Sequence, residues 1–359
     1  MKKEYRKILV APLDWGLGHA TRCIPLIQFF QKRGCEVLIA SSGKALELLK
    51  LEFPELAFKE LPSYDIHYEH QSMILNMMQQ LPKLRRIIMR ENQALKDILK
   101  EESFDLIISD NRYGIHHAEV PGIFLGHQLA IQLPHNMKML SVFAKTWHNQ
   151  MLKPFKQIWV PDYMANPNLS GKLSHGVKMH TPIYFIGPLS RLNYRPDIDQ
   201  DLPLLVLLSG QEPRRTQFEQ KVIEQLEKWG EETLLVRGLP GETEVPESPY
   251  PFLKIINHLP AGEMEETIAR AKRIVCRSGY SSVMDLAAMR KKVLFVPTKG
   301  QTEQEYIAKY LSSIGHATYV TEDAMHLAQN LEQLDLMYPL SLRNDRLEEL
   351  VSLALEELN

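Results

Sequence analysis

The sequence is poor in cysteine and has no long apolar run. Its 359 residues include three cysteines, Cys23, Cys35 and Cys276, which are odd in number and far apart. They fit neither a disulfide framework nor a zinc site. No apolar run reaches the length of a membrane-spanning helix, and the charged start, Met1 to Arg6, is not followed by the apolar core of a signal peptide. We therefore expect a cytoplasmic protein.

The sequence also lacks a dense patch of basic and aromatic residues, which argues against nucleic acid as a partner. The formal net charge is only -2, but residues 1–190 are net basic and residues 191–359 are net acidic. The length is large for one core and suits two domains. Two halves of opposite charge are therefore expected to meet different partners.

Strand and helix patterns alternate through the first half. Lys7–Pro12 is a short apolar run, a glycine turn follows, Thr21–Lys32 is a helical pattern, and Glu36–Ala40 is the next strand. Further strands are predicted at 104–109, 122–125, 157–160 and 183–186. Alternation of this kind predicts a doubly wound parallel sheet, which binds ligands at the carboxyl ends of its strands.

The alternation restarts after a segment rich in proline and aspartate. We place a first Rossmann-like domain at 1–190, a linker at 191–203 and a second Rossmann-like domain at 204–336. Residues 337–359 are expected to form a helix that packs back on the first domain. The predicted fold class is α/β, with two Rossmann-like doubly wound domains that face each other across a cleft.

The glycine turn after the first strand carries a candidate catalytic histidine. It reads Gly16-Leu17-Gly18-His19, and a following helix start favours negative charge. A histidine here can accept a proton from a hydroxyl, and Asp110, at the end of another predicted strand, can fix its tautomer. The competing interpretations are a packing or capping role for His19 and a helix cap for Asp110.

Three segments of the second half suit a nucleotide-sugar. The strongest is the run Cys276–Ala288, where a strand ends in Arg-Ser-Gly and hydroxyl residues open a helix that carries an aspartate one turn in. The others are the turn Ser209–Gln211 and the polar loop after Phe295. A plain tight turn and a helix cap are the respective alternatives for these two.

These residues resemble the nucleotide-binding half of family 28 glycosyltransferases, the group with the MurG-type N-acetylglucosaminyltransferase. The match runs from about Leu204 to Gly315 and is most specific in CRSGYSSVMDLAA and LFVPTKGQTEQEYIAKYL. The resemblance implies a GT-B fold, with Asp285 on the ribose, Gln304 and Glu305 on the hexose, and the backbone at His258 and Leu259 on uracil. It further implies that Ser209 and Arg191 meet the diphosphate. A second glutamine in the family stands where this chain has Glu305.

The complete predicted donor site is Gly18, Arg191, Ser209, Gly210, Gln211, His258, Leu259, Arg277, Ser278, Gly279, Ser281, Ser282, Asp285, Gln301, Gln304 and Glu305. We expect helix amide groups and either Arg191 or Arg277 to stabilise the leaving diphosphate without a metal. No cofactor is expected beyond the UDP-sugar co-substrate.

The first half resembles family 28 less closely. Its Gly-x-Gly-His-x-x-Arg loop is similar to that of PseG-type UDP-sugar hydrolases, which share the architecture. The function expected is transfer of a hexose or N-acetylhexosamine from a UDP-sugar to an acceptor hydroxyl, with His19 as base. The alternatives are a UDP-sugar hydrolase, a sugar-nucleotide epimerase and a non-catalytic sensor of sugar nucleotides.

The acceptor is not named by any motif. Met73–Arg90 mixes apolar residues with four cationic ones, a composition that suits an anionic membrane surface, and Pro82 is expected to break it. A lipid-linked acceptor of a cell-envelope glycan, at the inner face of the membrane, is therefore one hypothesis. The other interpretation of this segment is an ordinary amphipathic core helix.

Overall fold

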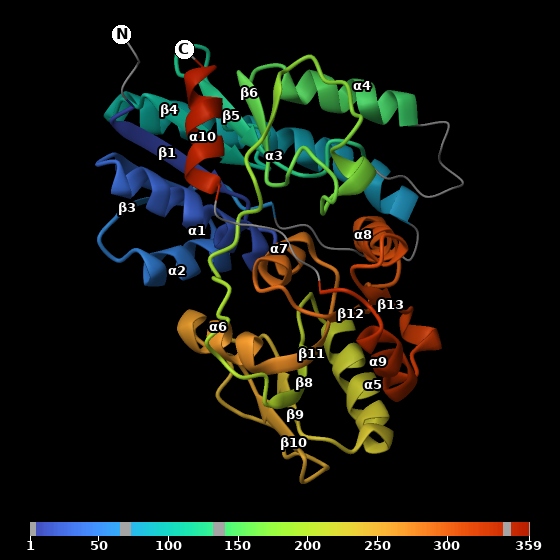
Figure 1. Ribbon diagram of the computed structural model, residues 1–359. Helices are drawn as coiled ribbons and strands as arrows, with labels where there is room; N and C mark the ends of the chain where they lie inside the picture. The colour runs from blue at the N-terminus through green and yellow to red at the C-terminus, as the bar shows by residue number, and fades with distance from the viewer. Residues whose placement is uncertain (1–4, 65–72, 132–140, 340–345, 359) are drawn as a thin grey trace. The chain divides into compact units, whose positions relative to one another are not determined.

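The computed structural model describes residues 5–64, 73–131, 141–339 and 346–358. The chain divides into two compact units. The first comprises Met1–Arg191 together with Asp345–Asn359, and the second comprises Leu192–Asn344. Each unit contains one parallel sheet (Figure 1). The prediction of two doubly wound α/β domains is therefore confirmed.

The first unit is built on a seven-stranded sheet in the order β3-β2-β1-β4-β5-β6-β7. The strands are β1 (Lys7–Pro12), β2 (Glu36–Ser41), β3 (Ala57–Glu60), β4 (Leu106–Asp110), β5 (Gly122–Leu125), β6 (Gln157–Val160) and β7 (Ile183–Phe185). Every pair is parallel. The middle strands are buried along nearly their whole length, which explains their continuous apolar runs.

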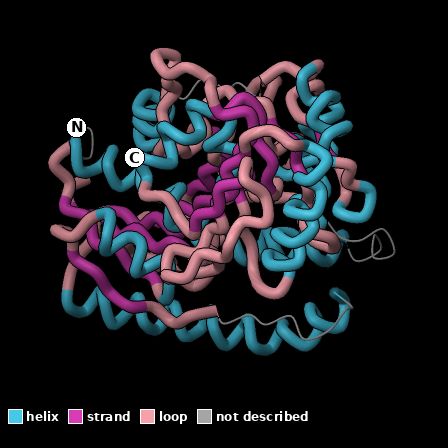
Figure 2. The backbone as a smooth tube through the Cα atoms, turned by 90° about the horizontal axis from the view of Figure 1, so that it is seen from below, coloured by secondary structure: helices cyan, strands magenta, loops and turns pink. Residues whose placement is uncertain are grey.

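Helices connect these strands and cover the sheet, as the colouring by secondary structure in Figure 2 shows. They are α1 (Leu17–Lys32), α2 (Gly43–Glu52), α3 (Met73–Glu101) and α4 (Ser141–Leu152), with a short 3₁₀ turn η2 (Gly171–Leu173). Gly16 is the N-cap of helix α1, and its φ of 80° favours glycine. It buries its apolar face, which includes Cys23, Ile24 and Phe30.

The expected break at Pro82 is wrong. The helix α3 runs without interruption from Met73 to Glu101. An interior proline removes one backbone hydrogen bond of a helix. The long helical segments on both sides keep their own hydrogen bonds, so the helix continues through Pro82. From Lys83 onward the helix is amphipathic, with Ile87 and Leu95 buried and Met89 exposed.

The last helix, α10 (Leu347–Glu356), belongs to the first unit. The backbone oxygen of Ala354 accepts a hydrogen bond from the buried side chain of Gln157 at 2.8 Å. Ser352 accepts another from Arg33 at the end of α1. Val351 and Leu355 are buried, so both polar and apolar contacts hold this helix in place.

The second unit has a six-stranded parallel sheet in the order β10-β9-β8-β11-β12-β13. Its strands are β8 (Leu202–Leu207), β9 (Thr233–Val236), β10 (Leu253–Ile256), β11 (Ala271–Cys276), β12 (Val293–Phe295) and β13 (Thr318–Tyr319). Its helices are α5 (Arg214–Trp229), α6 (Ala261–Arg270), α7 (Tyr280–Ala288), α8 (Thr302–Ser313) and α9 (Leu327–Asp335), with a 3₁₀ turn η3 (Glu322–Ala324). A core centred on Phe218, Val206 and Val275 joins α5 to the sheet.

Candidate functional site

The carboxyl edge of the first sheet brings three predicted strand ends together. Pro12, the last residue of β1, pairs in register with Asp110 of β4, and Asp110 pairs with Leu125 of β5. Three segments therefore converge at this edge: the glycine turn before α1, Asp110, and the residues that follow β5. Helix α1 begins here and presents His19 from its first turn.

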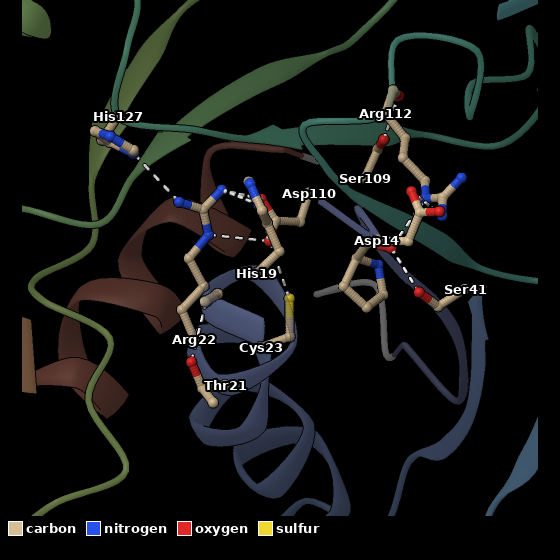
Figure 3. Close-up of polar contacts among 12 residues, drawn as sticks. Asp14, His19, Thr21, Arg22, Cys23, Ser41, Ser109, Asp110, Arg112 and His127 are labelled. Carbon is tan, nitrogen blue, oxygen red and sulfur yellow. Dashed lines mark hydrogen bonds and ion pairs between the residues drawn. The ribbon is translucent and has the colours of Figure 1, made fainter. Parts of the chain in front are cut away.

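The structure places His19 against Asp110 (Figure 3). Nδ1 of His19 lies 3.2 Å from both carboxylate oxygens of Asp110. The His19 side chain is 15% exposed, whereas Asp110 is fully buried. Within the described part of the chain, Nε2 of His19 makes no hydrogen bond. With the proton on Nδ1 directed at the carboxylate, Nε2 keeps a lone pair that can accept a substrate proton.

Charge and burial set the protonation states of this pair. Burial lowers the pKa of His19; the Asp110 charge opposes this effect and the Arg22 charge adds to it. Burial alone would raise the pKa of Asp110, but the charges of Arg22 and His19 outweigh burial and hold that pKa well below its usual range. At neutral pH Asp110 is therefore ionised and His19 is neutral, as a general base requires.

Three residues to which the sequence assigned no catalytic role complete the cluster. Arg22 contacts Asp110 and His127, and the Cys23 thiol lies 3.5 Å from the Asp110 carboxylate (Figure 3). Arg22 follows His19 by three residues on α1, a spacing that puts both side chains on one face of a helix. That spacing is the signal that could have identified Arg22.

A second buried cluster supports the loops around this edge. Arg112 is fully buried and donates to Glu91 of α3 at 2.8 Å and to the Ser42 hydroxyl before α2 at 2.9 Å. It also donates to the backbone oxygens of Pro12 and Pro62. One guanidinium thus connects β1, the start of α2, the segment after β3 and α3. This connection fixes the surroundings of the glycine turn.

The carboxyl edge of the second sheet gathers the predicted donor segments of that unit. Leu207 of β8 pairs in register with Cys276 of β11, and Cys276 pairs with Phe295 of β12. The turn after β8, the start of α7 and the loop after β12 therefore lie at one edge. Doubly wound sheets bind ligands at this place.

Helix α7 begins at this edge without a side-chain cap. Its N-cap is Gly279, which has no side chain to cap the first turn. A Cβ atom at Gly279 would meet no atom within 4 Å, so the backbone there is open. Ser281, Ser282 and Asp285 are each partly exposed along the first turn and a half. This arrangement suits an anionic group with a hydroxylated group beside it.

The side chain of Arg277 is buried within the second unit. It is 1% exposed, its guanidinium lies 3.9 Å from the centre of the Phe218 ring, and it donates to Glu322 at 2.6 Å. It donates also to the backbone oxygen of Val296. We expected either Arg191 or Arg277 to stabilise the diphosphate, and this role stays a prediction for Arg277, whose side chain is paired with Glu322 here. The side chain is directed into the unit because the Phe218 ring and the Glu322 carboxylate stabilise its positive charge.

The polar residues after β12 form hydrogen bonds within their own loop. Gln304 accepts a hydrogen bond from the backbone of Thr298 at 2.9 Å and donates to the side chain of Gln301. Glu305 accepts from the backbone of Gly300 at 2.8 Å. The buried Ser278 hydroxyl donates to the backbone oxygen of Gln304 at 2.8 Å. These contacts hold the loop in front of α8, and contact with a hexose stays a prediction for these side chains.

The remaining predicted donor residues lie at strand ends or turns. Ser209, Gly210 and Gln211 are exposed directly after β8, and Gly210 has a φ of 106°. His258 is exposed and Leu259 is nearly buried just after β10. Gly18 and Arg191 are partly exposed in the first unit, in the first turn of α1 and at the end of the unit's main segment.

Asn257 positions the segment that includes His258. Its side chain accepts a hydrogen bond from Arg237 at 2.9 Å and donates to the backbone oxygens of Glu242 and Glu244. Arg237 in turn pairs with Glu219 of α5. A chain of polar contacts therefore joins the end of β10 to α5.

Metal independence stays a prediction. Aspartates two residues apart do occur in the linker, at Asp197, Asp199 and Asp201, and such spacing can serve a divalent cation. Asp197 pairs with Arg195, and Asp201 pairs with Arg270. Across the ranges that the structure describes, no three His, Cys, Asp or Glu side chains are grouped to hold a metal.

Comparisons with known proteins agree with this architecture. Residues 216–348 match the model of the glycosyltransferase family 28 C-terminal domain. An uncharacterized glycosyltransferase of Methanosarcina acetivorans is 25% identical over 92% of this chain and 88% of its own length. A UDP-N-acetylglucosamine–N-acetylmuramyl-(pentapeptide) pyrophosphoryl-undecaprenol N-acetylglucosamine transferase of Histophilus somni is 37% identical, over 20% of this chain and 22% of its own length.

Solved structures share the fold at low sequence identity. The calicheamicin glycosyltransferase CalG4 aligns with a TM-score of 0.65 and 15% identity, over 99% of this chain and 94% of that one. MurG of Acinetobacter baumannii aligns with a TM-score of 0.57 and 14% identity, over 98% and 94%. The expected resemblance is confirmed: the chain is a glycosyltransferase of the GT-B fold, and its residues 216–348 match the family 28 C-terminal domain.

Proposed function

We propose that this glycosyltransferase moves a hexose or N-acetylhexosamine from a UDP-sugar to an acceptor hydroxyl, without a metal and with His19 as the general base. The observation that carries the proposal is the His19–Asp110 contact of 3.2 Å at the carboxyl edge of the first sheet. The base is oriented by an ionised carboxylate, and its second nitrogen makes no hydrogen bond to the described residues.

The reaction we propose is a single displacement. Nε2 of His19 takes the proton of the acceptor hydroxyl, the oxygen attacks the anomeric carbon, and the bond to the diphosphate breaks with its electron pair on UDP. Asp110 stabilises the imidazolium that forms. One displacement with no covalent intermediate inverts the anomeric configuration, which nuclear magnetic resonance of the product can establish.

The second unit would bind the donor. The uncapped start of α7 supplies amide groups and the hydroxyls of Ser281 and Ser282 for the diphosphate, and Asp285 is placed one turn further on for the ribose. With the Arg277 side chain engaged inside the unit, Arg191 is the arginine we retain for the phosphates. Gln304 and Glu305 would face the sugar after a rearrangement of their loop contacts.

The acceptor is proposed to be lipid-linked. The printed name of the Histophilus somni relative includes a pyrophosphoryl-undecaprenol acceptor. Lys83, Arg85, Arg86 and Arg90 are exposed on α3 beside the exposed Met89, a composition that suits an anionic lipid surface at the cytoplasmic face. No described helix is long and apolar enough to cross a bilayer.

Two experiments test these proposals. Release of UDP from UDP-glucose, UDP-galactose and UDP-N-acetylglucosamine is measured with and without saccharide and polyprenyl-phosphate acceptors, with EDTA present. Acceptor-dependent release is expected. Free sugar formed without an acceptor would indicate a hydrolase, a new sugar nucleotide would indicate an epimerase, and binding without turnover would indicate a sensor. Pelleting with anionic vesicles is expected to exceed pelleting with neutral ones, and no pelleting with either contradicts the membrane proposal.

A further inference from the structure

Arg22 is bound to the carboxylate of the proposed base pair through two nitrogens. Its Nε donates to one oxygen of Asp110 at 2.9 Å, and its Nη2 donates to the other. The Arg22 side chain is 2% exposed and that of Asp110 is fully buried. A side-on contact of this kind fixes the plane of the carboxylate as well as its charge, which a lysine in the same place would not do.

The same guanidinium reaches two histidines. Its Nη2 lies 3.0 Å from Nδ1 of His19, and its Nη1 lies 3.2 Å from Nδ1 of His127. Arginine has no acceptor, so Nδ1 of His127 accepts this hydrogen bond and its proton sits on Nε2. Arg22 thus lies between the two imidazoles, as Figure 3 shows.

The charged and titratable groups around His19 come from three elements. Helix α1 supplies Arg22 and Cys23, β4 supplies Asp110, and the segment after β5 supplies His127. Burial raises the pKa of Cys23 well above its ordinary value, so this thiol stays neutral. Among the described residues of this cluster, His19 therefore faces one anion, Asp110, and one cation, Arg22, which contact each other.

Nδ1 of His19 faces two competing partners. It can donate its proton to the Asp110 carboxylate at 3.2 Å, or it can accept a proton from Arg22 at 3.0 Å. The first tautomer leaves Nε2 as a base, and the second places a proton on Nε2 and removes the base. Nη2 of Arg22 already donates to Asp110, and an ionised carboxylate is the stronger acceptor for the Nδ1 proton.

We propose that Arg22 is a positioning residue, which holds Asp110 ionised and side-on so that Asp110 takes the Nδ1 proton, and which offsets the carboxylate charge so that His19 stays neutral. The catalytic importance of this arrangement rests on the proposed function, in which His19 is the general base. The proton arrangement itself belongs to the free protein and can be observed without any substrate.

Removal of the Arg22 charge is expected to change the titration of His19. The Asp110 charge would then act on His19 without the opposing charge of Arg22, although burial would still lower the pKa, and a nearby opposite charge raises the pKa of a cationic group by about 1–3 units. The acid limb of kcat/KM is expected to move to higher pH by the same amount. From a wild-type pKa below 6.5, a shift of about one unit would lower activity at pH 6.5 by at most about fivefold more than activity at pH 8.5.

The test is nitrogen-15 NMR of the free protein, with labelled histidine and the His19 signals assigned by their loss in His19→Gln. The wild type is expected to show the Nδ1–H tautomer and a pKa below 6.5, the ordinary histidine value. Arg22→Met is expected to raise the His19 pKa by at least about one unit. Arg22→Lys keeps the positive charge but loses the side-on contact through two nitrogens. Its His19 pKa is therefore expected to lie close to the wild-type value, without a single preferred tautomer. Arg33→Gln, which removes an exposed arginine of the same helix, is the matched control and should change neither property.

Two results would overturn the inference. One is an Nε2–H tautomer in the wild type, which would make Arg22 the donor to Nδ1. The other is an unchanged His19 pKa in a folded Arg22→Met protein. If Arg22→Met does not fold, the inference is still tested by the His19 tautomer of the wild type and by the His19 tautomer of Arg22→Lys. If the expected tautomer and pKa are found but no UDP-sugar is turned over, the proposed function fails and the positioning role stands. If a UDP-sugar is turned over but the tautomer or the pKa differs from the expected one, the positioning role is rejected and the proposed function stands.

Discussion

Replacement of His19 by alanine is expected to abolish most of the activity with little effect on the fold. General base catalysis contributes about 100- to 10,000-fold, which corresponds to about 3–5 kcal/mol of transition-state stabilisation. The His19 side chain is partly exposed, and Asp110 keeps its contacts with Arg22, so the free energy of unfolding should fall by only about 1 kcal/mol. The loss should therefore appear in kcat rather than in the KM for the donor.

The assay is initial-rate UDP release from pH 5.5 to 9. Because burial lowers the pKa of His19, wild-type kcat/KM should be level near pH 7 and fall only below pH 6.5, as the base becomes protonated. This acid limb should be missing in His19→Ala. His180→Ala removes an exposed histidine of the same unit and is the matched control. An effect below about tenfold in His19→Ala, or an unchanged acid limb, would refute the role of His19 as the base.

The remaining predictions concern stability and thiol reactivity. Arg112→Met should lower the free energy of unfolding by about 3–5 kcal/mol in urea denaturation, because it leaves a buried carboxylate unpaired; a change below about 1 kcal/mol would contradict the bridging role of this arginine. Arg277→Met should lower the thermal midpoint while UDP affinity in the folded protein changes less than about threefold; a large loss of affinity at unchanged stability would instead support a phosphate-binding role for Arg277. In the native protein at pH 8, a thiol reagent should modify Cys35 before Cys23 and Cys276, whose pKa values are raised by burial, and Cys35→Ser should remove this first reaction. Equal rates for the three thiols would contradict the burial pattern.

The fold could be predicted because its signal is periodic. Apolar runs such as Ile107–Ser109 alternate with helical patterns and end in polar residues, and only a parallel sheet accounts for all of these features. The order of the central strands then brings the end of β1 beside the end of β4. For this reason the proximity of His19 and Asp110 could be expected from the sequence.

The direction of individual side chains could not be predicted in the same way. Arg277 and Asp110 both end or follow a buried strand, yet the Asp110 carboxylate receives His19 while Arg277 turns toward Phe218. Which way such a side chain turns depends on partners distant in sequence, and Glu322 is 45 residues away from Arg277. The role of Arg22 was missed for the same reason, since its meaning depends on Asp110, 88 residues later.

Titration of the protein with UDP by isothermal calorimetry tests most directly the claim that the carboxyl edge of the second sheet holds a uridine nucleotide. We predict saturable binding of UDP without added metal, weaker binding of GDP and CMP, and a loss of affinity of about tenfold or more in Asp285→Asn, because the amide would replace an ionised acceptor for the ribose hydroxyls. Equal affinity for UDP in the wild type and the variant, or no binding of UDP at all, would contradict the account.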